Sequence, residues 1–227
     1  MLISGTVAAY LAADPEPLQD GTVTIAEEDG AEYASTRTDS QGRFEVPAPA
    51  GDTIYALITS EGEAVVSFTG TSGFEPELAI PDDTFFAVPG WQREEWASTF
   101  AGCPGIGDRG LIVGQVHVFL PGVEVGEDTI VNAARVRATL PDSDPLEGEG
   151  WEACYLTAEG DAWDPEAERT GRSGWYAIPD LERGPYTLLV EVEFAEGLFS
   201  ANLYRVWMPP RGVAPRFPTL VDFPTPR

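Results

Sequence analysis

The sequence predicts an all-β fold of two tandem antiparallel β-sandwiches, each with about seven strands. Three observations support this prediction. The chain of 227 residues is long enough for two domains of about 100 residues each. Its 24 Gly and 20 Pro separate short runs rich in Val, Ile, Thr, Phe and Tyr, which is typical of many short strands. Two strand patterns also occur twice in the same order, so the second half of the chain repeats the first.

The repeat consists of an opening strand and a later hairpin. The opening strand Ile3–Val7 returns as Ile112–Val116, at a sequence offset of 109 (116 minus 7). The hairpin Arg37–Pro47 returns as Arg169–Pro179, at an offset of 132 (174 minus 42). Both copies therefore pair the same two elements in the same order.

The offset between the copies grows along the chain. Val136 corresponds to Val23 at an offset of 113 (136 minus 23), so the second copy is longer by 19 (132 minus 113) before its hairpin. The additional length falls within Pro141–Glu168, which we call the insert.

The elements of the first half follow from turn chemistry and alternation. Asp39–Gly42 is a tight turn in which Gly42 accepts positive φ, and Phe44 and Val46 alternate toward a core. The expected strands of this first sandwich, over residues 1–80, are Leu2–Leu11, Thr22–Ala26, Glu32–Thr38, Arg43–Val46, Thr53–Ser60 and Ala64–Thr69.

Residues 81–110 join the two halves as an aromatic interdomain segment. Within it Gln92–Thr99 is predicted to be a short helix that presents Trp91, Trp96 and Phe100. We expect these aromatic side chains to bury against both modules, because a solvated linker would not carry three large rings.

The second sandwich is expected over residues 111–208. Gly174 permits its hairpin turn, and Tyr176 and Ile178 fill its core. Its expected strands are Leu111–Leu120, Ala133–Leu140, Glu168–Ile178, Thr187–Phe194 and Leu198–Trp207. The last segment, 209–227, holds six prolines and is expected to be an extended, polyproline-like tail along a domain edge.

Charge excludes some partners. The chain carries 38 Asp plus Glu against 13 cations, all Arg, for a formal net charge of −25. Such a surface disfavours nucleic acid and anionic lipid. It is typical of solubility in a salty medium, and a divalent cation or a cationic partner is the alternative. No apolar run approaches the length of a membrane span, and the N-terminus lacks the pattern of a signal peptide.

Cys103 and Cys154 allow one disulfide. Both lie in Gly/Pro-rich or polar surroundings, which favours a surface staple, and a bridged pair places the protein outside the cytoplasm, secreted or on the cell surface. Two buried free thiols are the first alternative. Metal or redox chemistry is the second, although no C-x-x-C occurs.

The hairpin motifs resemble a known family. Thr-Asp-x-x-Gly-Arg-Phe-x-Val-Pro at Thr38–Pro47 is similar to the carboxypeptidase regulatory-like domain, a transthyretin-like, Ig-like β-sandwich. The other matching pieces are Ile3–Val7 and Ala50–Ile58 in the first copy and Ile112–Val116, Thr170–Pro179 and Gly184–Val190 in the second. The second copy departs at Gly171 and at Trp175-Tyr176. The resemblance implies an accessory, adhesive or ligand-presenting module rather than an enzyme.

The sequence contains few of the residues and motifs on which catalytic sites depend. His117 is the only histidine, which excludes multi-His metal sites and the His-rich centres of enzymes with related sandwiches. No Gly-x-Ser-x-Gly occurs. Alternation places His117 on the face opposite Val116 and Val118, and we expect it to face solvent. We therefore predict neither catalytic residues nor a cofactor.

Three acidic segments raise a calcium hypothesis: Asp39–Gly42, Asp142–Asp144 and Asp161–Glu168. None has the twelve-residue loop that ends in Glu, so turn chemistry is the alternative to a weak Ca²⁺ site in the insert.

The aromatic residues of the insert are the best functional clue. Trp151, Tyr155 and Trp163 are expected to form a recognition element on a loop, or else to cap the end of the sandwich. The leading function is a non-catalytic, extracytoplasmic binding or structural module, within a surface or multi-subunit assembly. Its partner would be a protein, a glycan or another copy of the chain. The alternatives are a carbohydrate-binding module of a secreted hydrolase and a hydrolase that uses carboxylates.

Overall fold

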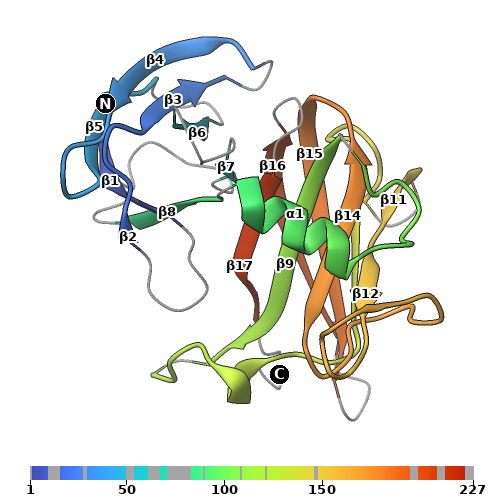
Figure 1. The fold of residues 1–227 in the computed structure, drawn as a ribbon. Coiled ribbons are helices and arrows are strands. Elements are labelled where there is room, and N and C mark those ends of the chain that lie inside the picture. Colours follow the sequence, from blue (N-terminus) through green and yellow to red (C-terminus); the bar gives the residue numbers. More distant parts are fainter. Residues whose placement is uncertain are drawn as a thin grey trace. The chain divides into compact units, whose positions relative to one another are not determined.

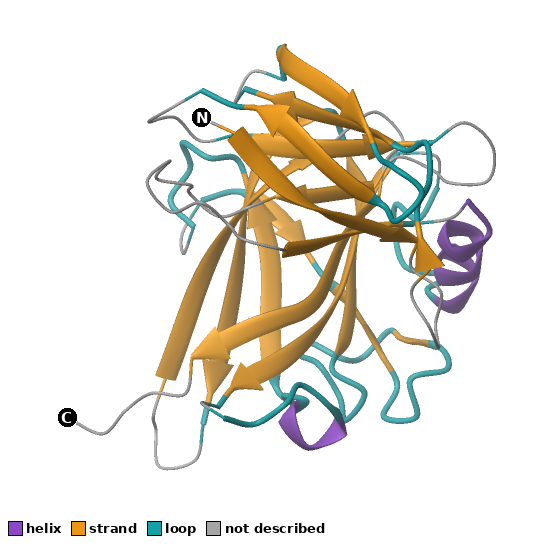
Figure 2. Cartoon of the chain, turned by 90° about the vertical axis from the view of Figure 1, so that its left-hand side faces the viewer, coloured by secondary structure: helices purple, strands orange, loops and turns teal. Residues whose placement is uncertain are grey.

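The computed structural model describes residues 2–9, 16–27, 30–49, 54–60, 67–70, 83–88, 90–107, 109–120, 122–145, 148–194, 199–208 and 213–222. Strands dominate this part of the chain, joined by loops and two short helices, α1 (Gly90–Thr99) and the 3-10 helix η1 (Glu127–Thr129) (Figures 1 and 2). No described helix has the length and apolar character needed to span a bilayer. The all-β prediction is confirmed.

Two compact units make up the chain. The first comprises Met1–Glu95, Glu182–Pro185 and Arg205–Pro215, and the second comprises Trp96–Leu181, Tyr186–Tyr204 and Arg216–Arg227. The division after Glu95 falls within the segment 81–110 that was expected to join the two halves.

The first unit is a sandwich of two sheets. In one sheet β1 pairs antiparallel with β5 and β2 and parallel with β8, and the other sheet has the order β4-β3-β6-β7. Val213 of β17 pairs with Ser67 of β7. The strands are β1 (Leu2–Ala9), β2 (Glu16–Pro17), β3 (Thr22–Ala26), β4 (Glu32–Arg37), β5 (Arg43–Pro47), β6 (Tyr55–Thr59), β7 (Ser67–Gly70) and β8 (Asp83–Ala87).

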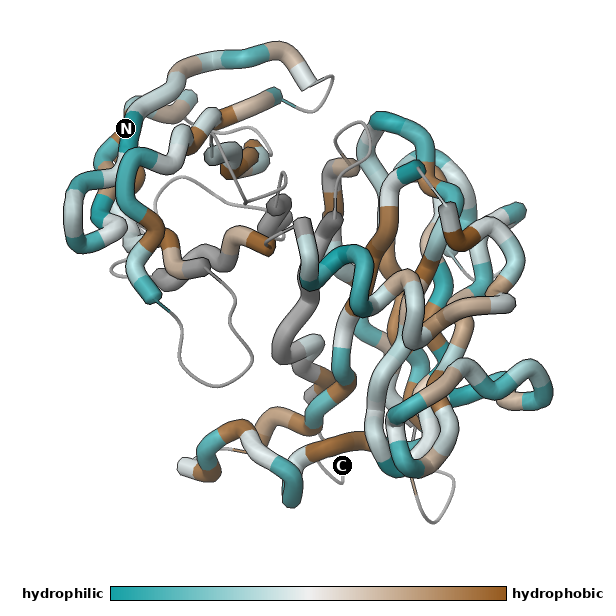
Figure 3. The backbone as a smooth tube through the Cα atoms, in the orientation of Figure 1, coloured by the Kyte–Doolittle hydropathy of each residue, from teal (hydrophilic) through white to brown (hydrophobic). Residues whose placement is uncertain are grey.

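Alternating side chains fill the space between these two sheets. Phe44 and Val46 are buried while their neighbours in β5 are exposed, as predicted. Figure 3 shows hydrophobic and hydrophilic positions interleaved along the strands. The core consists of Ile3, Val7, Val23, Ile25, Phe44, Val46, Ala48, Ile54, Ala56, Ile58 and Ala87.

The second unit also has two sheets. Their orders are β11-β10-β15-β16 and β13-β12-β14-β9-β17. The strands are β9 (Gly110–Phe119), β10 (Ala134–Thr139), β11 (Gly150–Glu152), β12 (Cys154–Leu156), β13 (Trp163–Asp164), β14 (Trp175–Leu181), β15 (Gly184–Glu193), β16 (Phe199–Met208) and β17 (Val213–Asp222). Tyr176 and Ile178 are fully buried, as predicted from the repeat.

The tail differs from the sequence prediction. Residues 213–222 form strand β17, which pairs with β9, rather than a polyproline-like segment. The physical reason is alternation, since Thr219 and Val221 are buried and give the segment a face that a sheet can cover. Residues 209–212 and 223–227 lie outside the described part.

Strand register is the same in the two units. Gly5 pairs with Phe44 in the first unit, and Gly114 pairs with Tyr176 in the second. The offsets are 109 (114 minus 5) and 132 (176 minus 44), the values found in the sequence. The turn glycines also agree, because Gly42 has φ +71° and Gly174 has φ +68°.

A buried threonine repeats with the same bonds. In the first unit the Thr38 hydroxyl accepts from Gly21 N–H at 2.9 Å and donates to the carbonyl of Leu18. In the second unit the Thr170 hydroxyl accepts from Ala134 N–H and donates to the carbonyl of Val131, both at 2.9 Å.

The structure divides the additional length of the second copy into two parts. Ile25 pairs with Ala34, whereas Ala138, at the equivalent position of β10, pairs with Trp151. The offset at this strand is 117 (151 minus 34), so an excess of 4 (117 minus 113) precedes β11 and an excess of 15 (132 minus 117) follows it. The second part contains the β12–β13 hairpin.

The aromatic residues in and just after α1 differ in burial. Trp96 and Phe100 are buried, whereas Trp91 is 46% exposed, so the expectation that all three bury is wrong for Trp91. Positions 96 and 100 share one helix face, and position 91 lies on another.

Replacing either threonine by valine should destabilise its unit. Thr38→Val and Thr170→Val each leave a buried N–H and a buried C=O without this hydroxyl, which we expect to cost about 1–3 kcal/mol of unfolding free energy. Urea unfolding measures the loss. Thr38→Ser and Thr170→Ser keep the hydroxyl and are the controls, and equal losses for Val and Ser would contradict this role.

Candidate functional site

The insert is not a single loop, because it contains the three short strands β11, β12 and β13. β11 pairs with β10 in one sheet of the second unit, and β12 pairs with β14 in the other. The chain therefore passes from one sheet to the other between Glu152 and Cys154. Ala153 lies at this crossing, and its N–H donates to the carbonyl of Val136 at 3.1 Å.

Tyr155 holds the crossing in place. Its hydroxyl accepts from Val136 N–H at 2.8 Å and donates to Val136 C=O at 3.2 Å. Burial raises the pKa of Tyr155 well above its ordinary value, so the phenol keeps its proton. The side chain is only 2% exposed, so the expectation of a surface aromatic at this position is wrong. Tyr155 pairs with Tyr176 in the sheet, and alternation along β12 turns its ring inward.

Trp151 and Trp163 are each partly buried. Trp151 meets Tyr186 edge-on, with ring centroids 5.2 Å apart at 86°. Trp163 lies against Gly102, where an added Cβ would come within 2.9 Å of its ring. Both contacts match the capping alternative, and a recognition role for these two side chains stays a prediction.

A cavity of about 370 Å³ opens beside the crossing. Arg135 directs its guanidinium at Glu152, with Nη2 2.9 Å from Oε1 and Nε 3.4 Å from Oε2, and this hydrogen bond raises the pKa of Arg135. Arg169 donates to the carbonyl of Ala133 at 3.3 Å. The lining residues are Arg135, Glu152, Ala153, Tyr155, Ala167, Glu168 and Arg169.

The lining of this cavity is mostly charged. Its charged groups are guanidiniums and carboxylates, and Glu152 already has Arg135 on both of its oxygens. Neither the carboxylate hydrolase nor the carbohydrate-binding alternative is supported by a contact among the described residues.

Sequence reasoning missed Arg135 and Arg169. The signal that could have found them is scarcity, since only 13 cations balance 38 acids and two of those cations line this cavity.

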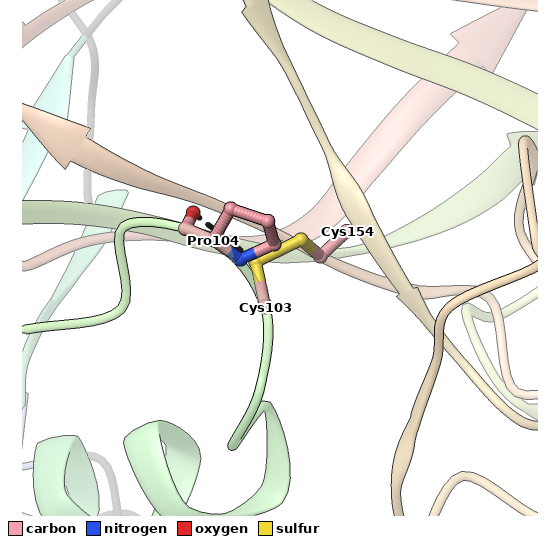
Figure 4. Close-up of a disulfide and its surroundings, with 3 residues drawn as sticks. All are labelled: Cys103, Pro104 and Cys154. Carbon is pink, nitrogen blue, oxygen red and sulfur yellow. Dashed lines mark hydrogen bonds between the residues drawn. A yellow bond between two sulfur atoms is a disulfide. The ribbon is translucent and has the colours of Figure 1, made fainter.

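Cys103 and Cys154 form a disulfide, the pairing expected from the sequence (Figure 4). Their Cα atoms are 6.2 Å apart, and the two positions differ by 51 in the sequence. The bridge ties the segment after α1 to β12, next to Tyr155. Cys103 is buried and Cys154 is partly buried, so the bridge is less exposed than the surface staple that was expected. The dashed line in Figure 4 joins Cys103 Sγ to Pro104 O at 3.7 Å, a packing contact because a bridged sulfur carries no hydrogen.

His117 is buried, contrary to the prediction that it faces solvent. It is 5% exposed, and its ring nitrogens lie 2.9 Å from Thr129 Oγ1 and 3.0 Å from Gln115 Oε1. The reason is that the chain around η1 returns to β9, where Thr129 places its hydroxyl against the ring and Ile130 forms an isolated β-bridge with His117. Burial lowers the pKa of His117, against a raising effect of a hydrogen bond with Gly126. Both nitrogens are engaged within the fold.

The carboxylates of the calcium hypothesis form turns. Asp39 accepts from Gln41 N–H at 2.8 Å and from Arg43 N–H at 2.9 Å, and the hydrogen bond from Arg43, followed by that from Gln41, lowers the pKa of Asp39. Asp164 accepts from Glu166 N–H at 3.0 Å. Within the described ranges no group of three or more His, Cys, Asp or Glu side chains is placed to hold a metal ion.

Comparison with known proteins gives weak likenesses. No family model matches the chain, and no curated protein matches it. Among solved structures, the Bacillus anthracis TIE protein is 13% identical with a TM-score of 0.29, over 98% of this chain and 33% of that one. The minor pilin GBS52 of Streptococcus agalactiae is 10% identical with a TM-score of 0.30, over 100% and 98%.

The shaft pilin spaA of Lactobacillus rhamnosus GG is 11% identical with a TM-score of 0.30, over 100% of this chain and 98% of that one. The chain thus spans a third of the length of the TIE protein and nearly the full length of the two pilins. Because these scores are low, the function proposed below rests on the contacts of this chain.

Removing the disulfide should destabilise the second unit. We expect Cys103→Ser with Cys154→Ser to lower the unfolding free energy by about 2–4 kcal/mol, since the bridge closes a long loop in the unfolded chain. Guanidinium unfolding measures this loss, and the wild type in reductant should match the double variant. Two free thiols in denatured, non-reduced wild type would contradict the bridge.

The free energy of unfolding should decrease as the pH is lowered below about 6.5, the ordinary pKa of histidine. Because the pKa of His117 is lowered in the folded state, the unfolded chain takes up a proton there that the folded chain refuses. The stability from neutral His117 is therefore complete above pH 6.5 and declines as the pH falls toward the lowered pKa. His117→Gln should lose this part of the decline in Tm between pH 7.5 and 5.5. An unchanged decline in the variant would show that carboxylates alone cause it.

Proposed function

We propose that this chain is a non-catalytic binding or structural module that works outside the cytoplasm, within a surface or multi-subunit assembly. The observation that carries the proposal is the same hydrogen-bonded frame built twice, around Thr38 and Thr170. A chain that repeats its frame gains length and rigidity, which are properties of a scaffold.

The finer proposal is that both units are copies of one transthyretin-like module of the carboxypeptidase regulatory-like type. The common register of Gly5–Phe44 and Gly114–Tyr176 supports it. So does the positive φ of Asp20 and Ala133, which lie beside the two threonines at the same offset of 113 (133 minus 20). Two unrelated sandwiches would have no reason to share these details. We propose module boundaries near 1–80 and 111–208.

The chemistry of the second unit supports a role without catalysis. The ring nitrogens of His117 and the hydroxyl of Tyr155 are all hydrogen-bonded within the fold. The disulfide supports a location outside the cytoplasm, where such bonds persist. A net charge of −25 keeps the chain dispersed and favours partners other than nucleic acid.

Within this function we propose the insert, 141–168, as the recognition element. Trp151 and Trp163 are partly exposed, while Tyr155 fixes the backbone between them from the inside. An anchored pair of rings loses little conformational entropy when a partner covers it.

The proposal predicts that antibodies to this chain label intact, unpermeabilised source cells or their secreted material. Native extraction should recover the chain in a complex larger than its own 24.4 kDa. Trp151→Ala with Trp163→Ala should release the chain from that complex, provided that its Tm stays close to that of the wild type. Arg172→Ala, an exposed change in the same unit, is the control. A chain found only in the cytoplasm with reduced cysteines would overturn the proposal.

A further inference from the structure

Among the described strands, β4 is the edge strand of its sheet in the first unit. β4 ends the sheet β4-β3-β6-β7, and none of the described strands pairs with its outer side. Four of its six residues are exposed, and Tyr33 is 47% exposed. An open edge of this length presents a row of backbone donors and acceptors to another strand.

The direction of one hydrogen bond tells which residues of β4 present those groups. Thr38 N–H donates to Gly21 O at 2.8 Å, toward β3. Alternate residues of an antiparallel strand point their amide groups to opposite sides. Thr36 and Ala34 therefore also bond toward β3, while the N–H and C=O groups of Arg37, Ser35 and Tyr33 point outward. The pairing with β3 is regular from Arg37 to Ala34 and shifts near Glu32.

Charged side chains on an edge usually prevent pairing, because like charges would meet. The order of side chains in β4 avoids this repulsion when the added strand is β4 of a second copy of the chain. Two copies of β4 that pair antiparallel about a two-fold axis normal to the sheet must match residues of the same face. Ser35 at the axis then opposes the partner's Ser35, and Tyr33 opposes the partner's Arg37, twice. A guanidinium against a phenol ring is attractive.

Glu32 adds charge complementarity at the same place. Its carboxylate accepts from the Ser35 hydroxyl at 2.8 Å, which holds it on the outward side of the strand. In this register the partner's Arg37 lies opposite Tyr33, next to Glu32. Each end of the paired strands thus brings one carboxylate, one ring and one guanidinium together.

We propose that β4 of one chain pairs with β4 of a second copy of this chain, antiparallel and centred on Ser35. This inference rests on the proposed function and names the partner of one surface of the assembly. An interface that uses the same edge in both copies closes at two chains, so it makes a dimer rather than a filament.

The second unit has a shorter edge at the equivalent place. Its strand at the equivalent place is β11, which has three residues, and the chain then leaves it for the β12–β13 hairpin. The equivalence follows from the pairs Ile25–Ala34 and Ala138–Trp151. An edge half as long offers fewer backbone groups, so the first unit is the one suited to strand addition.

Salt should strengthen this dimer. Two chains of net charge −25 repel each other, and the repulsion acts over distances that salt screens to about 10 Å at 0.1 M. The backbone bonds and the ring contact depend little on salt. Association that rises with ionic strength therefore fits the edge, whereas a purely ionic interface would weaken.

Sedimentation velocity over a range of chain concentrations, at low and at high salt, tests the proposal. We expect a monomer–dimer equilibrium that Ser35→Pro weakens at least about tenfold, since proline removes an outward N–H at the axis, on both copies. Arg37→Glu should weaken it similarly. Arg172→Glu changes the net charge by the same amount at an exposed turn of the second unit and should leave the dimer unchanged. Circular dichroism and Tm confirm that each variant folds.

A cross-link tests the register itself. Ser35→Cys would place two thiols at the two-fold axis, at a Cα separation of about 5.5 Å that a disulfide can span. Since the native cysteines are both bridged, the introduced thiols are the ones free to react. We expect a covalent dimer on non-reducing gels after mild oxidation. Gln41→Cys, an exposed position in the following turn, is the matched control and should stay monomeric.

The outcomes separate this inference from the proposed function. A dimer that Ser35→Pro and Arg37→Glu leave intact would overturn the β4 interface while leaving the assembly function standing. A wild-type chain that stays monomeric under every condition would also overturn it. The surface labelling of source cells tests the proposed function independently of either result.

Discussion

Each unit depends on a buried threonine hydroxyl that fixes the connection into its second sheet. Thr38 and Thr170 bond the backbone on both sides of a residue, Asp20 or Ala133, whose φ is +58° or +65°. A non-glycine residue in this region costs energy, and it persists where its surroundings hold it. The hydroxyl supplies that hold by bonding the N–H on one side and the C=O on the other. Strands β3 and β10 then start in a fixed direction, and the registers of both sheets follow.

The repeat in the sequence predicted most of the fold. Turn glycines and alternating apolar residues are local signals, so Gly42, Phe44 and Val46 could be placed from the sequence alone, and β3 has the bounds that the pattern predicts. The failures are long-range. His117 is buried where the chain around η1 returns to β9, with Thr129 against its ring and Ile130 paired with it, and alternation within β9 could not reveal this.

The candidate site was predictable in position but not in orientation. The offsets located the insert, and Trp151, Tyr155 and Trp163 are all in it. The Gly- and Glu-rich composition of the segment predicted a loop. In the structure β11 and β12 are strands of two different sheets. That pairing turns Tyr155 inward to Val136. Arg135 of β10 and Arg169 of the loop before β14 line one cavity beside the crossing, a proximity that spacing along the chain does not encode.

Strand β17 has a consequence for folding. Tyr176 lies over Gly114 so closely that an added Cβ would come within 2.4 Å of its hydroxyl oxygen, and that hydroxyl is 2.9 Å from Thr219 Oγ1. Two strands of the second unit are thus joined to a third, through a contact between residues 43 positions apart in the sequence. Contacts this distant along the chain raise the contact order, and a higher contact order slows folding. We therefore expect the pairing of β17 with β9 to be a slow step in the folding of the second unit.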